Sequence, residues 1–123
     1  MHLTYMIDEA AQKVQEEHIK NAFAQLAATG KLIRISALDM NIVDVAGIEV
    51  PASNRTLEQE KKMSDFYTFV LSTYAEQVPA KQWGGIVKEK IVDDERGLWS
   101  NDYMRKPVYA GFAEGLRSFP KSN

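Results

Sequence analysis

Three cationic side chains gather around the expected start of one helix. Arg55 comes directly before Thr56, and Lys61 and Lys62 follow within two helical turns. Thr56 and Gln59 have the spacing of a capping box, in which the hydroxyl accepts from the amide three residues on and the glutamine returns a bond. A helix N-terminus with free amides and cationic neighbours attracts phosphate. The stretch therefore predicts an anion-binding site, although a capping box alone also explains Thr56 and Gln59.

The C-terminal part of the sequence continues this positive charge. Residues 96–123 carry five Lys or Arg against two Asp or Glu, whereas residues 1–95 carry ten against fifteen. The net charge of −2 shows that the chain as a whole is not a basic nucleic-acid binder. A path for phosphate along the tail would use Arg96, Arg105, Lys106 and Arg117.

Aromatic side chains stand among these cations. Trp83, Trp99 and Tyr103 offer faces on which bases of a single strand could stack beside phosphate-neutralising neighbours. Positions in a core or an interface explain the same residues equally well.

Other chemistries find little support in the sequence. It contains two histidines and no cysteine, which argues against structural zinc and a thiol nucleophile. No phosphate-loop motif and no serine-nucleophile motif is present. The acidic segment with Asp93, Asp94 and Glu95, together with Asp102, could gather magnesium for a nuclease, although a solvated acidic loop is the simpler interpretation.

Hydrophobic periodicity predicts the elements that must position these residues. Period-two alternation favours strands, and apolar residues at helical spacing favour helices. Asp8 and Thr56 are expected helix caps, and Pro107 suits a first helical position. The expected strands cover residues 2–7, 31–36 and 41–50, with a turn at 39–41, and the expected helical segments cover residues 9–29, 57–78, 80–92 and 107–118.

This order predicts one α+β domain over residues 1–123. We expect a small antiparallel or mixed sheet of about three strands packed against three to four helices, with residues 105–123 forming a C-terminal helix and basic tail. A hydrophobic content of 45% and a charged content of 26% are typical of a folded chain. No apolar run long enough to span a membrane occurs, and the absence of cysteine favours the cytoplasm.

The stretch from Asn54 to Met63 resembles a motif of the Orf (NinB) family of lambdoid-phage recombination mediators. The matching residues are Asn54, Arg55, Thr56, Leu57, Glu58, Gln59, Lys62 and Met63, and the later stretch AKQWGGIV is similar to a tryptophan-bearing segment of that family. The sequence departs from the family at Glu60, in an apparent insertion over residues 38–53, and in a shorter tail.

The resemblance implies a non-enzymatic phage protein of the host cytoplasm that uses no cofactor. It implies a homodimer that binds single-stranded DNA without sequence preference and assists recombination where a host single-strand binding protein coats the strand. The alternative is a small protein-interaction module, such as an immunity, anti-defence or adaptor protein, that binds a partner through the acidic face of residues 1–95.

Overall fold

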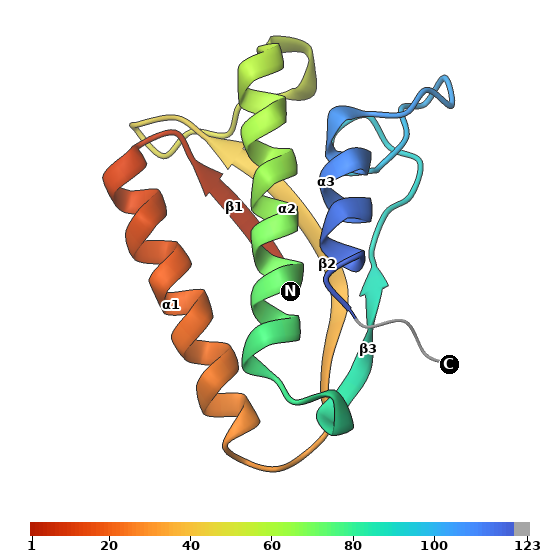
Figure 1. Ribbon diagram of the computed structural model, residues 1–123. Coiled ribbons are helices and arrows are strands. Elements are labelled where there is room, and N and C mark those ends of the chain that lie inside the picture. Colours follow the sequence, from red (N-terminus) through yellow and green to blue (C-terminus); the bar gives the residue numbers. More distant parts are fainter. Residues whose placement is uncertain (120–123) are drawn as a thin grey trace.

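The computed structural model describes residues 1–119, so residues 120–123 of the predicted basic tail lie outside the described part (Figure 1). Residues 1–119 include two short 3₁₀ helices, Ala52–Asn54 and Ala80–Gln82. No helix of residues 1–119 is long and apolar enough to cross a bilayer. In chain order the main elements are β1 (His2–Met6), α1 (Glu9–Ala27), β2 (Ile33–Val43), α2 (Leu57–Gln77), β3 (Trp83–Lys88) and α3 (Pro107–Leu116).

The three strands form one sheet in the order β1-β2-β3, and all three helices lie on one face of it (Figure 1). The predicted α+β arrangement of a small sheet and three helices is therefore confirmed. Both strand pairs are parallel. Each strand is followed by a helix that returns the chain to the opposite end of the sheet, which is the connection that parallel pairing requires.

The helix starts follow the expected capping chemistry. The Asp8 carboxylate accepts from the amides of Ala10 and Ala11 at the start of α1. Thr56 and Gln59 form both hydrogen bonds of the capping box at the start of α2. Pro107 occupies the first turn of α3, where a backbone N–H would have no partner within the helix, so its absence in proline costs no hydrogen bond.

Strand β2 contains a bulge at Ala37, which was not predicted from the sequence. Ala37 has φ of 51°, and the buried positions change from Ile33 and Ile35 to Leu38, Met40 and Ile42. An extra residue in a strand shifts the alternation of its side chains by one. The expected turn at residues 39–41 and the separate strand over 41–50 are therefore wrong, because β2 runs without interruption to Val43.

The helical segment expected over residues 80–92 is also wrong, because β3 occupies Trp83–Lys88. Gly85 has φ of 108°, a conformation that favours glycine. At Gly84, a Cβ atom would lie 3.1 Å from the carbonyl oxygen of Ile33, so glycine allows β3 to approach β2 closely. The apolar spacing that suggested a helix results from a strand that is only partly buried.

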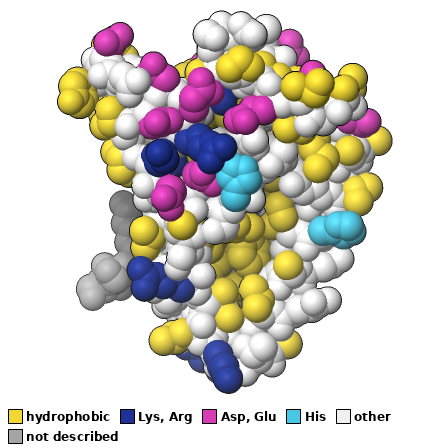
Figure 2. All heavy atoms as spheres, turned by 180° about the vertical axis from the view of Figure 1, so that it is seen from behind, with side chains coloured by type: hydrophobic (Ala, Val, Ile, Leu, Met, Phe, Trp, Pro, Cys, Tyr) yellow, Lys and Arg dark blue, Asp and Glu magenta, His cyan; other side chains and the backbone are white. Residues whose placement is uncertain are grey.

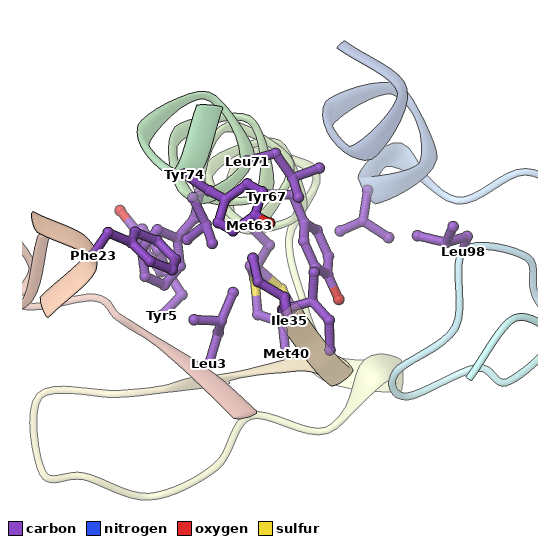
Figure 3. Close-up of a cluster of buried hydrophobic side chains, with 14 of the residues drawn as sticks. Leu3, Tyr5, Phe23, Ile35, Met40, Met63, Tyr67, Leu71, Tyr74 and Leu98 are labelled. Atoms are coloured by element: carbon purple, nitrogen blue, oxygen red, sulfur yellow. The ribbon is translucent and has the colours of Figure 1, made fainter. Parts of the chain in front are cut away.

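The hydrophobic core fills the space between the sheet and α2. Figure 3 shows side chains of β1 and β2 pointing toward Met63, Tyr67, Leu71 and Tyr74 of α2. The Tyr74 hydroxyl donates to the carbonyl oxygen of Ile33 and thereby satisfies a buried polar group. The following large side chains of this core are each at most 2% exposed: Tyr67, Tyr74, Phe66, Leu38, Met40, Ile42, Met63, Leu71, Val70 and Val78.

Candidate functional site on the helix-free face of the sheet

A buried carboxylate joins three segments on the sheet face that carries no helix. Asp39 follows the bulge in β2, and its side chain is only 8% exposed. One carboxylate oxygen lies 2.5 Å from Nδ1 of His2 in the neighbouring strand, and the other accepts from Nη1 of Arg96 at 3.3 Å. Because Leu38 and Met40 point into the core, the alternation of the strand places Asp39 on the opposite face.

A second carboxylate approaches the same guanidinium. Glu49 lies 3.9 Å from Nη2 of Arg96, so Arg96 stands between Asp39 and Glu49. Asn41, two residues beyond Asp39 on the same face, has the one buried side-chain oxygen within residues 1–119 that has no hydrogen-bond partner. A buried acceptor without a partner is uncommon, because it loses its bond to water and gains no other.

Lys88 ends β3 beside this network. Its ammonium donates to the carbonyl oxygens of Lys90 and Arg96 at 2.9 Å and lies 5.9 Å from the ring centroid of Tyr67. Burial lowers the pKa of Lys88 to about 8, against the opposing attraction of Asp39. Burial likewise raises the pKa of Tyr67. Lys88 thus links β3 to the loop that carries Arg96.

Figure 2 shows the face opposite the helices. Acidic and basic side chains gather around a histidine in its upper half, and a band of hydrophobic atoms runs down the middle below them. The arrows of all three strands point toward the upper side in Figure 1. The polar network lies on the helix-free face, at the start of β1, midway along β2 and at Lys88, the last residue of β3. The α/β proteins with parallel sheets place their ligands at the carboxyl ends of the strands, and of the three strands here only β3 ends at the network.

The helix end that the sequence marked as an anion site is closed by the protein itself. Arg55 is 1% exposed and pairs with Glu95 at 3.3 Å. Its guanidinium also donates to the carbonyl oxygens of Val50 and Glu95. The Thr56 amide donates to Gln59, and the Gln59 amide to the Thr56 hydroxyl. Arg55 therefore ties together two loops instead of facing solvent.

Four of the other predicted cations line one groove between α2 and α3, with a volume of about 800 Å³: Lys61, Arg105, Lys106 and Arg117. Lys61 lies 3.9 Å from Asp65, and Arg117 lies 2.6 Å from Glu114. Lys106 donates to the carbonyl oxygens of Asp93 and Asp94, and burial lowers its pKa.

The remaining predicted residues lie elsewhere. Lys62 points to the other side of α2, where it pairs with Glu9 and Glu58. Arg96 belongs to the Asp39 network. The structure therefore does not bring the eight predicted residues onto one surface.

The three aromatic candidates differ in exposure. The Trp83 indole donates to the carbonyl oxygen of Val78 and packs edge-on against Phe119, so it is partly buried against the core. Trp99 packs against Tyr109, and the Arg105 guanidinium lies 5.5 Å and 4.7 Å from their ring centroids. Tyr103 is 73% exposed.

The acidic segment forms internal contacts instead of a metal site. The Asp93 carboxylate accepts from the amides of Arg96 and Glu95, and these bonds lower its pKa. Asp94 accepts from the amide of Asn101. Within residues 1–119, no group of three or more acidic or histidine side chains could hold a metal ion.

The network residues His2, Asp39 and Lys88 were not singled out from the sequence, although a signal was available. In the stretch IRISALDMNIV, the apolar residues keep a period of two on each side of Ala37 only if one residue is skipped. That shift places Asp39 and Asn41 together on the face away from the core.

No family model and no curated protein sequence matches this chain. Solved xylanase structures do match. Native xylanase10C from Cellvibrio japonicus has a TM-score of 0.73 at 24% identity, covering 98% of this chain and 28% of that chain. A thermostable mutant of a xylanase (Xyn10A) from the same organism has a TM-score of 0.76 at 22% identity, covering 94% and 38%.

A third similar structure is a glutamate-to-alanine mutant of xylanase10C in complex with xylopentaose, with a TM-score of 0.70 at 21% identity. The chain thus spans between about a quarter and two fifths of these xylanases. At this level of identity the likeness establishes the fold.

These matches correct the functional expectations. The resemblance to Orf (NinB) recombination mediators is wrong, because the structural neighbours are xylanases and not phage recombination proteins. The expectation of a non-enzymatic, single-stranded DNA-binding protein is overturned by the same finding, since xylanases are enzymes. The alternative of an immunity or adaptor module gains no support. The expected homodimer stays a prediction.

Proposed function

We propose that this chain is one part of a glycoside hydrolase that acts on xylan-type polysaccharides, and that it contributes the polar network of His2, Asp39 and Arg96, on the helix-free face of the sheet, to the sugar-binding cleft. The observation that carries the proposal is the match to xylanases over 94–98% of the chain, with TM-scores of 0.70–0.76.

The shape of the sheet supports this assignment. All-parallel sheets are almost always covered on both faces or closed into barrels. Here the helices cover one face, and within residues 1–119 no helix covers the other (Figure 1). A (β/α) barrel has helices outside the sheet and packed side chains inside it, and its active site lies at the carboxyl ends of the strands. The network of His2, Asp39 and Arg96 lies on the helix-free face, level with the carboxyl end of β3 at Lys88.

The chemistry of the network fits a supporting role in such a cleft. Hydrolysis of a glycosidic bond uses two carboxyl groups about 5–10 Å apart, on either side of the scissile bond. Asp39 already binds His2 and Arg96, so it acts as a positioning residue that orients both toward the cleft. The Asn41 oxygen offers an acceptor to a sugar hydroxyl. At least one reacting carboxyl group would come from the portion of the hydrolase that this chain does not span.

The test is a titration of the isotope-labelled protein with xylopentaose, followed by the backbone amide signals in NMR. We expect weak binding, with a dissociation constant on the order of 1 mM, and shifts at residues 2, 39–41 and 96. Maltopentaose, with a different sugar and linkage, should cause no such shifts. Asp39→Asn should weaken the binding of xylopentaose. Absence of shifts at these residues up to about 10 mM sugar would refute the proposal.

A further inference from the structure

A groove lies between α2 and α3, which run side by side on the helix-covered face of the sheet (Figure 1). Its volume is about 800 Å³, and both helices contribute to its walls. Where they line the groove, the helices are in direct contact, because the Thr68 hydroxyl donates to the carbonyl oxygen of Gly111 at 2.8 Å. The packing of the two helices therefore fixes the shape of the groove.

The charges around this groove are unevenly matched. Four cationic side chains and two carboxylates line it: Lys61, Arg105, Lys106, Arg117, Asp65 and Glu114. Asp65 lies 3.9 Å from Lys61, and Glu114 lies 2.6 Å from Arg117. Within residues 1–119, no carboxylate forms an ion pair with Arg105 or Lys106. The groove is therefore basic, although the net charge of the chain is −2.

Aromatic contacts hold Arg105 in place. Its guanidinium lies 5.5 Å from the ring centroid of Trp99 and 4.7 Å from that of Tyr109. The two rings pack edge to face, with their centroids 5.6 Å apart. A guanidinium that lies over aromatic rings keeps its N–H donors, and this planar group binds a carboxylate through two parallel hydrogen bonds. The Arg105 side chain is therefore preorganised for the carboxylate of a ligand.

The other groups of the groove suit a sugar that carries a carboxylate. Tyr109 lines the groove and offers an aromatic surface to the C–H face of a sugar ring. The exposed carboxylates of Asp65 and Glu114 are acceptors for hydroxyl groups. They would repel a chain with a charge on every unit, such as a nucleic acid. A sugar chain with neutral units between its carboxylates avoids this repulsion.

We propose that this groove binds the uronic acid units of an acidic polysaccharide, and that Arg105 receives the carboxylate. Lys61 of α2 and Arg117 at the end of α3 attract the same group from the two walls. The choice of a polysaccharide rests on the proposed hydrolase function, whereas the choice of an acidic one rests on the charges of the groove. The polar network lies on the helix-free face, so the groove is a second site, separate from the proposed cleft.

The test uses one branched oligosaccharide in two forms. Xylotetraose with a single glucuronic acid branch is titrated into the isotope-labelled protein, and so is the same compound with its carboxyl group reduced to an alcohol. We expect the acidic form to shift the amide signals of residues 61–68 and 105–117, and the reduced form to bind there at least about tenfold more weakly. Equal affinity of both forms, or no shift up to about 10 mM of the acidic form, would overturn the proposal.

Three variants locate the binding site. Arg105→Gln should weaken binding of the acidic form about tenfold. The Lys61 side chain is 78% exposed, so Lys61→Gln leaves the fold intact and should weaken binding about two- to threefold. Arg34→Gln is the control, because Arg34 is an exposed arginine that lies outside this groove, and it should leave the affinity unchanged. Wild-type affinity in both Arg105→Gln and Lys61→Gln would contradict the assignment.

A peptide probe tests whether the groove selects a sugar. Acetyl-Gly-Glu-Gly-amide carries one carboxylate but no hydroxyl group for Asp65 or Glu114, so it should bind at least about tenfold more weakly than the acidic oligosaccharide. Equal affinity would show that the groove binds peptide carboxylates, and would refute the proposal. The proposed hydrolase function is tested separately, because its failure appears as missing shifts at residues 2, 39–41 and 96 with neutral xylopentaose.

Discussion

Leu38 and Asp39 are neighbours in β2, yet they face two surfaces of opposite character. Leu38 is fully buried against α2, among aliphatic and aromatic side chains. Asp39 is almost as deeply buried, but its partners are His2 and Arg96. The helix-covered face is stabilised by area removed from water, whereas the opposite face depends on a few directional bonds. Changes on the first face should therefore cost more stability than changes on the second.

The largest effect is expected where α3 crosses α2. A Cβ atom on Gly111 would lie 1.9 Å from the Ser64 carbonyl oxygen, a backbone atom that cannot yield without moving a helix. Gly111→Val should lower the free energy of unfolding by more than about 4 kcal/mol, as measured by urea denaturation. Gly115→Ala is the milder comparison, because the nearest atoms to its Cβ would belong to the side chain of Leu71, at 2.7 Å and beyond, and not to a backbone. A Gly111→Val protein as stable as Gly115→Ala would contradict the packing described.

A smaller loss is expected from a cavity in the same face. Leu38→Ala removes a side chain that is 0% exposed, and should cost about 2–5 kcal/mol in urea denaturation. Leu32→Ala changes the same residue type at a site that is 71% exposed, and should alter stability by less than about 0.5 kcal/mol. Similar losses at both positions would show that the helix-covered face is not the main source of stability.

On the opposite face, Asp39→Ala should cost about 1–3 kcal/mol. It leaves the His2 ring and the Arg96 guanidinium without their shared acceptor, although Glu49 remains close to Arg96. Asp65→Ala is the matched control, because Asp65 is exposed and its pair with Lys61 is solvated. A loss at Asp39 greater than that at Leu38 would reverse the ranking of the two faces.

The smallest effect concerns the pH dependence at Lys88. Its folded-state pKa of about 8 lies below the ordinary value of 10.5, so the unfolded chain binds more protons between these values. Stability from this group therefore rises as pH increases from about 8 toward 10, by less than about 1 kcal/mol once solvent screening is considered. Lys88→Met should flatten the slope of unfolding free energy against pH, and Lys81→Met should not. An unchanged slope in Lys88→Met would show that Lys88 is not the source of the pH dependence of stability.

Local signals allowed much of the helical structure to be predicted. The cap at Thr56 and the apolar stripe from Met63 to Tyr74 located α2, because capping bonds and a period of 3.6 residues depend only on neighbours in the chain. Asp8 and Pro107 located the starts of α1 and α3 for the same reason. By contrast, β3 resembled a helix because Trp83, Ile86 and Val87 fall at helical spacing, and only its pairing with β2 shows that this segment is a strand.

The candidate site depended on contacts that the sequence does not reveal. The charge of Arg55 was visible, but its burial against Glu95 depends on two loops that are forty residues apart. His2, Asp39 and Arg96 come from three separate segments, and only the bulge at Ala37 and the fold of the last loop bring them together.

By itself, the sequence determined where α1, α2 and α3 begin, the α+β class and the apolar residues available for a core, since these follow from short-range periodicity and capping. The tertiary structure alone decided the parallel pairing, the face to which each strand residue points and the partners of each charge. A single extra residue in β2 exchanges the faces to which its following side chains point. A charged side chain binds a ligand or forms an internal ion pair depending on the groups that pack against it. Both outcomes are set by long-range packing.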